Sequence, residues 1–109
     1  MVLYKARFTV DFEKDTQFLK KDKSLSERVQ KKVIEILQNP EHYKPLRNVL
    51  KGKRRVHVGH YVILYEIDSD AVVFHRFKPH DDAYKEWVVM FILIEILYAL
   101  SKHHQLTSK

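Results

Sequence analysis

Cysteine is absent from the chain, and its 109 residues include only two glycines and three prolines. The lack of cysteine excludes a disulfide scaffold, a cysteine-ligated zinc site and a thiol nucleophile. The sequence also has no Gly-rich phosphate-binding loop and no GxSxG motif, which argues against P-loop and serine-hydrolase chemistry. The N-terminus lacks an apolar run of signal-peptide length, so the cytoplasm is the expected location.

Positive charge exceeds negative charge along the chain. There are 20 Lys and Arg residues against 14 Asp and Glu, which gives a net charge of +6 at pH 7. This balance favours an anionic partner, which could be nucleic acid, an acidic protein or a membrane surface. Hydrophobic residues make up 45% of the chain and charged residues 31%, as is typical of a soluble globular protein. We therefore expect one domain over residues 1–109, with a single core.

Hydrophobic periodicity predicts a mixed fold. Alternating or apolar segments over 2–10, 53–58, 61–67 and 71–77 indicate strands, and 11–23 and 26–39 indicate helices. Ser24 and Glu27 form a possible capping box before the second helix, and Asn39-Pro40 ends it. Closely joined helices predict an antiparallel hairpin, and three strands with short turns predict an antiparallel meander. The expected fold is α+β, with an N-terminal strand and a helical hairpin packed on a small, mainly antiparallel sheet, and with a C-terminal helix.

The strand predicted over residues 53–58 is the most basic part of the chain. Residues 44–65 contain no acid, and the two glycines, Gly52 and Gly59, bracket this strand. Alternation places Lys53, Arg55 and His57 on one face, because side chains on a strand have a period of two. Such a face could bind phosphate and carry a proton, or it could be a solvated basic surface. The same alternation places His75 and Arg76 on opposite faces of the last strand.

The C-terminal region is unusually apolar. From residue 87 to residue 100 every side chain is apolar except Glu95, counting tyrosine as apolar. A helix over 86–101 would be too apolar for the surface of a small monomer and short for a membrane span of about 20 residues. We expect it to be buried partly against the sheet and partly against another chain, through a protein partner or self-association over 87–100. A membrane-associated tail is the alternative.

The order of these elements resembles the RelE/ParE toxin superfamily. The resemblance is carried by DFEKDTQFLKK in the first helix, VIEILQNPEHYKPL at the end of the second, LKGKRRVHVGHYVILYEID in the meander and FKPHDDAYK after it. It covers residues 2–85, the expected core of the domain. The four segments in this order are specific for the superfamily, although no single segment is.

The resemblance implies a toxin that cleaves messenger RNA in the ribosome without a metal or another cofactor. In this chemistry a ribose 2′-hydroxyl attacks the adjacent phosphate, so the protein supplies proton transfer and positive charge. His80 would be the general acid, His57 the general base, and Tyr84 a stacking or positioning group. The implied RNA- and phosphate-binding residues are Lys51, Lys53, Arg54, Arg55, Arg76 and Lys78. The implied partners are a cognate antitoxin, messenger RNA and the ribosome, with no membrane.

One position departs from the family pattern. Many RelE-type toxins carry an arginine second in the strand after the turn, where this chain has Val62. Two further readings therefore stay open. One is a ParE-like inhibitor of DNA gyrase, and the other is a non-catalytic RNA-binding relic of a toxin.

Overall fold

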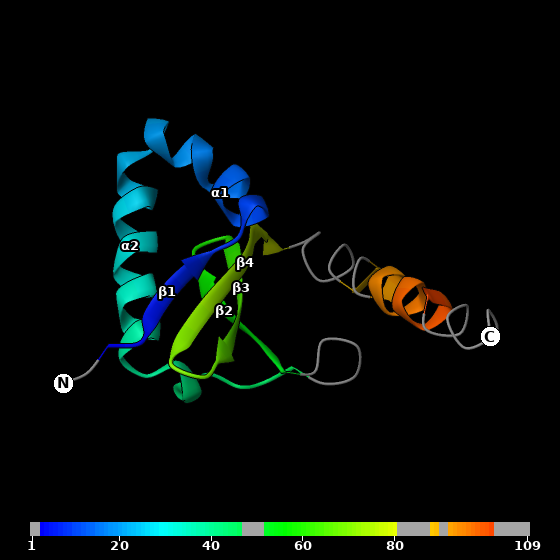
Figure 1. Cartoon of the computed structure of the whole chain (residues 1–109). Coiled ribbons are helices and arrows are strands. Elements are labelled where there is room, and N and C mark those ends of the chain that lie inside the picture. The colour runs from blue at the N-terminus through cyan, green and yellow to red at the C-terminus, as the bar shows by residue number, and fades with distance from the viewer. Residues whose placement is uncertain (1–2, 47–51, 81–87, 90–91, 102–109) are drawn as a thin grey trace.

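The computed structural model describes residues 3–46, 52–80, 88–89 and 92–101. The elements are β1 (Lys5–Phe8), α1 (Val10–Thr16), the 3-10 helix η1 (Gln17–Lys21), α2 (Lys23–Gln38), the 3-10 helix η2 (Pro40–His42), β2 (Lys53–Val58), β3 (Tyr61–Asp68) and β4 (Ala71–Pro79). Figure 1 shows this order along the chain. The predicted α+β class, with its N-terminal strand, helical hairpin and small sheet, is confirmed.

The described strands form a mixed sheet in the order β1-β4-β3-β2. β2, β3 and β4 pair antiparallel, as the predicted meander requires, and β1 pairs parallel with β4. Tight turns connect the meander, with Gly59 at φ 61° and Ser69 at φ 57°. The chain passes through both helices between β1 and the meander, and a long connection of this kind permits parallel pairing.

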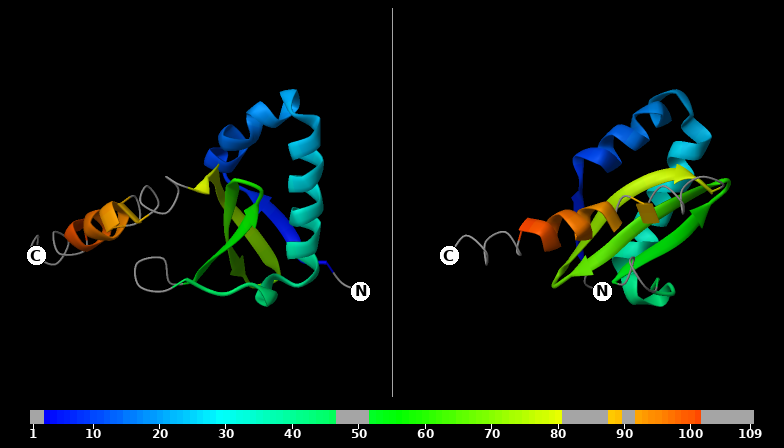
Figure 2. Two further views of the ribbon diagram at one scale, coloured as in Figure 1. Left: turned by 180° about the vertical axis from the view of Figure 1, so that it is seen from behind. Right: turned by 90° about the vertical axis from the view of Figure 1, so that its right-hand side faces the viewer.

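Side-chain caps fix the starts of the two helices. Thr9 Oγ1 accepts the Phe12 amide at 3.1 Å before α1, and Asp22 Oδ1 accepts the Leu25 amide at 3.1 Å before α2. The predicted capping box at Ser24 is therefore wrong, since Asp22 is the residue that caps α2. The helix predicted over 11–23 is also divided into α1 and η1. Figure 2 shows that α1 and α2 cover the same side of the sheet.

The core lies between these helices and the sheet. Phe12 from α1 and Ile36 from α2 meet Phe74 and Phe77 from β4, and all four side chains are buried. The ring centroids of Phe12 and Phe74 are 5.7 Å apart. Burying one such side chain contributes about 1.5–3 kcal/mol. This packing holds the sheet against the helices and leaves its opposite side, here called the outer face, for other groups.

A β-bulge in β4 decides which residues reach the outer face. Leu64 pairs with Arg76 and Tyr65 pairs with Phe74, so His75 is an extra residue in β4. Phe74 and Phe77 both lie in the core although they are three residues apart. The strict alternation expected for β4 is therefore wrong: His75 and Arg76 are both directed toward the outer face, because a bulge places two residues opposite one.

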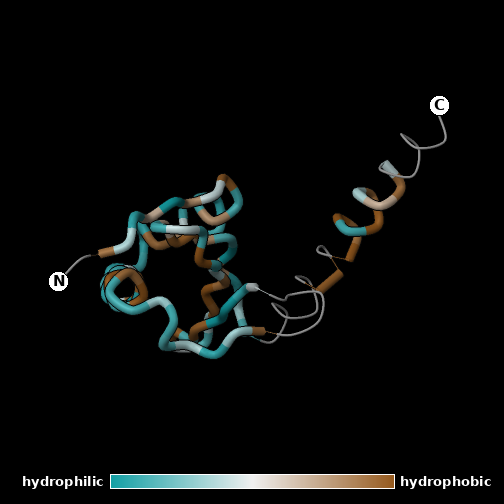
Figure 3. The backbone as a smooth tube through the Cα atoms, turned by 60° about the horizontal axis from the view of Figure 1, so that its bottom comes forward, coloured by the Kyte–Doolittle hydropathy of each residue, from teal (hydrophilic) through white to brown (hydrophobic). Residues whose placement is uncertain are grey.

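Residues 92–101 are helical, as predicted, but they do not pack against the sheet. The exposed fraction is 54% for Leu93, 65% for Leu97 and 60% for Leu100. Figure 3 shows this apolar segment extending away from the rest of the molecule. The expectation that it is buried partly against the sheet is therefore contradicted. Within the described residues, the helices are too short or too polar to cross a membrane.

Candidate active site

Two histidines from non-adjacent strands meet at one end of the sheet. The ring centroids of His57 in β2 and His80, just after β4, are 4.9 Å apart, with 37° between the ring planes. The His80 amide donates a hydrogen bond to the His60 carbonyl at 2.7 Å. This bond ties the end of β4 to the turn between β2 and β3, and so brings His80 across β3 to His57. The sequence-predicted acid and base therefore lie together.

A hollow of about 370 Å³ surrounds the histidine pair, and its lining residues are His57, Gly59, His60, Pro79 and His80. Burial lowers the pKa of His57, and the positive charges of His80 and Arg55 lower it further. The neutral form of His57, which can accept a proton, is therefore favoured near neutral pH. The hollow can thus hold a small polar group beside the two imidazoles.

Cationic side chains flank an apolar strip on the outer face. The strand register aligns Arg55 with Leu64 and Arg76, and aligns His57 with Val62 and Lys78. Val62 and Leu64 are buried, with exposed fractions of 2% and 0%. Val62, which replaces the arginine expected from the family pattern, therefore lies between the cationic residues of β2 and β4.

Lys53 and His75 share the carboxylate of Glu66 as a partner, farther along the sheet. Glu66 binds Lys53 Nζ at 3.3 Å and His75 Nε2 at 2.6 Å. Burial lowers the pKa of His75 and outweighs the neighbouring Glu66 carboxylate, which acts in the opposite direction. Lys53 is on the outer face, as predicted, but Glu66 compensates its charge.

Arg54 lies on the other side of β2. Its Nη1 donates to the backbone carbonyls of Tyr43 and Glu41, the latter at 3.4 Å. These bonds hold the segment after η2 against β2. The structure therefore does not bring Arg54 together with the histidines. Lys51 and Tyr84 lie outside the described residues.

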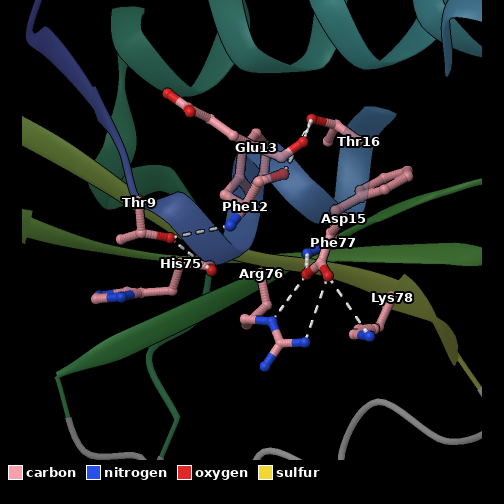
Figure 4. Close-up of polar contacts among 9 residues, drawn as sticks. All are labelled: Thr9, Phe12, Glu13, Asp15, Thr16, His75, Arg76, Phe77 and Lys78. Atoms are coloured by element: carbon pink, nitrogen blue, oxygen red, sulfur yellow. Dashed lines mark hydrogen bonds and ion pairs between the residues drawn. The ribbon is translucent and has the colours of Figure 1, made fainter. Parts of the chain in front are cut away.

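Asp15 in α1 organises the end of β4, as Figure 4 shows. It accepts hydrogen bonds from Arg76 Nε at 2.8 Å and from the Phe77 amide at 3.0 Å, and it lies 3.5 Å from Lys78 Nζ. The side chains of Asp15 and Arg76 are 8% and 11% exposed. β1 pairs only with residues 71–74 of β4. The Phe77 amide lies beyond these residues and donates to Asp15 instead. Arg76 lies on the outer face, but this carboxylate occupies part of its guanidinium.

Sequence reasoning missed Asp15, although a signal was present. Asp15 is three residues after Phe12 and four before Leu19, so it shares the buried face of the helical segment. A carboxylate on a buried face requires donors or cations. Within the described residues, no three His, Asp or Glu side chains are grouped to hold a metal ion.

Comparison with known proteins assigns the chain to a family. Residues 6–84 match the model of the ParE toxin of type II toxin–antitoxin systems, parDE. A protein of Methanocaldococcus jannaschii, named as a RelE toxin, is 40% identical over 70 residues, which are 62% of this chain and 74% of that protein.

Solved structures agree with this match. The RelBE2 toxin–antitoxin complex of Mycobacterium tuberculosis contains a chain that is 31% identical, with a TM-score of 0.60, over 72% of this chain and 99% of that chain. YafQ from Escherichia coli has a TM-score of 0.62 at 16% identity, over 74% of this chain and 98% of that chain, and this likeness shows the fold alone. On these matches the chain belongs to the ParE toxin family of type II toxin–antitoxin systems, within the RelE/ParE superfamily.

Proposed function

We propose that this toxin is a metal-independent endoribonuclease that cleaves messenger RNA on the ribosome and so inhibits translation. The contact between His57 and His80 is the observation that carries the proposal. It joins two proton-transfer groups in one hollow, beside the cationic residues Arg55 and Lys78. Proton transfer and charge stabilisation are what phosphodiester cleavage by a ribose hydroxyl needs.

The proposed reaction moves two protons, one from the RNA to His57 and one from His80 to the RNA. Neutral His57 accepts the proton of the 2′-hydroxyl as the 2′-oxygen–phosphorus bond forms. Protonated His80 donates a proton to the 5′-oxygen as the phosphorus–5′-oxygen bond breaks. The products are a 2′,3′-cyclic phosphate and a 5′-hydroxyl end. The two roles require opposite protonation states, and the lowered pKa of His57 supports its assignment as the base.

Positive charge near the hollow supports binding of the phosphate. Arg55 and Lys78 pair with Leu64 and Val62 of the apolar strip, from opposite sides. They would contact the scissile phosphate or its neighbours. Lys53 is farther along β2 and would act on the flanking RNA. Arg76, whose guanidinium binds Asp15, would mainly hold the end of β4 against α1, and Asp15 would also position Lys78. Tyr84 and Lys51, from outside the described residues, keep the stacking and binding roles that the resemblance implies.

A cognate antitoxin is the proposed protein partner. The similar structure from Mycobacterium tuberculosis is a toxin–antitoxin complex. An apolar groove of about 450 Å³ also lies between α1, η1 and α2, and its lining includes Phe12, Leu19 and Val33. Such a groove suits the apolar face of an amphipathic helix. The exposed apolar residues within 87–100 are the proposed surface for self-association.

Inhibition of DNA gyrase is the second candidate. The matching family model is that of the ParE toxin, and Val62 stands where many RelE-type toxins carry an arginine. That activity predicts a DNA-damage response with unchanged message levels. A non-catalytic relic predicts salt-sensitive RNA binding without cleavage on programmed ribosomes.

Induced expression followed by mapping of message 5′ ends separates these functions. We expect new 5′ ends within translated codons for the wild-type protein and their loss in the His80→Gln variant. His42→Gln is the matched control, because His42 is exposed on η2 and should leave cleavage unchanged. A DNA-damage response without new message ends would instead assign the gyrase function.

A further inference from the structure

A second hollow adjoins the histidine pair on the side of α2. It has a volume of about 290 Å³ and lies between α2 and the end of β2; its lining residues are Arg28, Lys31, Lys32, Glu35, His57, Val58 and Gly59. His57 and Gly59 also line the hollow around the histidine pair. The two hollows are therefore adjacent, so that an extended ligand could contact both.

The guanidinium group of Arg28 lies at this junction. A Cβ atom added to Gly59 would be 3.2 Å from Arg28 Nη1 and 3.3 Å from Nη2. Gly59 has a φ of 61°, which favours glycine, and its lack of a side chain lets Arg28 approach the turn. The tertiary fold thus brings a cation of α2 next to the turn that carries the proposed active centre.

The second hollow is cationic, and Val58 is the single apolar side chain among its described lining residues. Arg28, Lys31 and Lys32 contribute three positive charges, whereas Glu35 is the single acid among the described lining residues and binds Lys32 at 2.9 Å. A protein helix needs apolar anchors, which the groove between α1 and α2 offers instead. Cations without apolar anchors suit a polyanion whose charges repeat along a backbone.

We propose that this α2–β2 hollow binds the phosphate backbone of the same single-stranded RNA whose scissile phosphate lies in the hollow lined by His57 and His80. The inference rests on the proposed endonuclease function and extends it, because it assigns the flanking RNA strand to Arg28 and Lys31 of α2. Glu35 opposes binding at this surface and limits its strength.

The test measures binding of a fluorescein-labelled 12-nucleotide oligouridylate by anisotropy between 50 and 300 mM KCl. The double variant Arg28→Ala/Lys31→Ala should flatten the slope of log K against log salt by about 1.4, since each single-strand phosphate contact contributes about 0.7. At 0.1 M salt this corresponds to roughly 25-fold weaker binding. The control Lys14→Ala/Lys44→Ala removes the same charge from exposed positions elsewhere and should change the slope by much less.

Two single variants distinguish a loss of RNA contacts from misfolding of the double variant. Lys31→Ala removes one exposed side chain and should give about half of the slope change. Glu35→Gln should tighten RNA binding, an effect that mere damage to the fold would not produce. Equal slopes for the Arg28→Ala/Lys31→Ala variant and the control would overturn the inference. The inference would also be overturned if the Arg28→Ala/Lys31→Ala variant lost binding to a labelled 12-residue polyglutamate but still bound RNA like the wild-type protein. That result would assign the hollow to an acidic protein.

Cleavage of ribosome-bound message is measured separately with the wild-type protein. If the protein cleaves but the slopes are equal, the α2 inference fails and the endonuclease function stands. If the slope changes as expected but no cleavage occurs, the RNA surface stands and the endonuclease function fails.

Discussion

At the scale of single residues, Asp15 shows how one buried carboxylate positions several cations. Asp15→Asn removes its charge while Arg76 stays nearly buried, with an exposed fraction of 11%. Because breaking a buried ion pair leaves a charge uncompensated, we expect unfolding free energy to fall by about 2 kcal/mol. Urea denaturation measures this change. Asp11→Asn, at an exposed position of the same helix, should cost no more than about 0.5 kcal/mol, and equal losses for both variants would contradict the assigned role.

The His57–His80 contact makes a second prediction about single residues. His57 titrates below its ordinary value of 6.5, first because of burial and then because of His80 and Arg55. The pKa of His57, followed by NMR, should therefore rise in the His80→Gln variant without reaching 6.5. Lys44→Gln, which removes an exposed charge elsewhere, should leave it unchanged. An unaltered pKa in His80→Gln would mean that the two imidazoles do not interact.

The same shift predicts how His57 affects stability. Its pKa is lower in the folded state, so the unfolded chain binds the proton more readily as the pH falls below about 6.5. His57 therefore destabilises the folded state most at pH values below its folded-state pKa. Above about pH 6.5 its titration does not change the free energy of unfolding. The lowered pKa of His75 acts in the same direction.

Sequence reasoning identified some of these residues and missed others for physical reasons. The resemblance to a family indicated His57 and His80, and the structure brings the two rings together. Arg28 was missed because its position beside Gly59 depends on how α2 packs against the sheet. Such a contact between distant segments leaves no periodic signal in the sequence.

At the scale of elements, β4 shows the limit of period-two reasoning. An alternating pattern predicts the strand, but His75 is an extra residue that shifts the register. Phe74 and Phe77, which are three residues apart and both buried, are the sequence signal of this bulge. Without the bulge, Arg76 and Lys78 would point toward the core, so the cationic surface depends on it.

The C-terminal helix gives a prediction for a single element. Leu93 and Leu97 are 54% and 65% exposed, so Leu93→Glu/Leu97→Glu should leave unfolding free energy within about 0.5 kcal/mol of the wild-type value. If the segment mediates self-association, light scattering after gel filtration should show a dimer for the wild-type protein and a monomer for this variant. Gln30→Glu/Gln38→Glu adds the same charge to α2 and should remain dimeric. A monomeric wild-type protein at tens of micromolar would contradict this role.

At the scale of the whole molecule, the meander and the α+β class could be predicted because strands, turns and helices each have local signals. The parallel pairing of β1 with β4 has no such signal, since it depends on the path through both helices. The proposed active centre arises from this architecture: β2, the β2–β3 turn and the end of β4 meet at one end of the sheet. The hollow beside α2 continues that surface.

The most direct test of the central claim is a double-mutant cycle in single-turnover cleavage of ribosome-bound message. His57→Gln and His80→Gln should each slow cleavage by about 10²–10⁴-fold, as expected for loss of a general base or acid. The double variant should be hardly slower than the slower single variant, because residues that act as a unit in one transition state are strongly non-additive. Cleavage at the wild-type rate by either single variant, or rate losses that multiply in the double variant, would contradict one shared active centre.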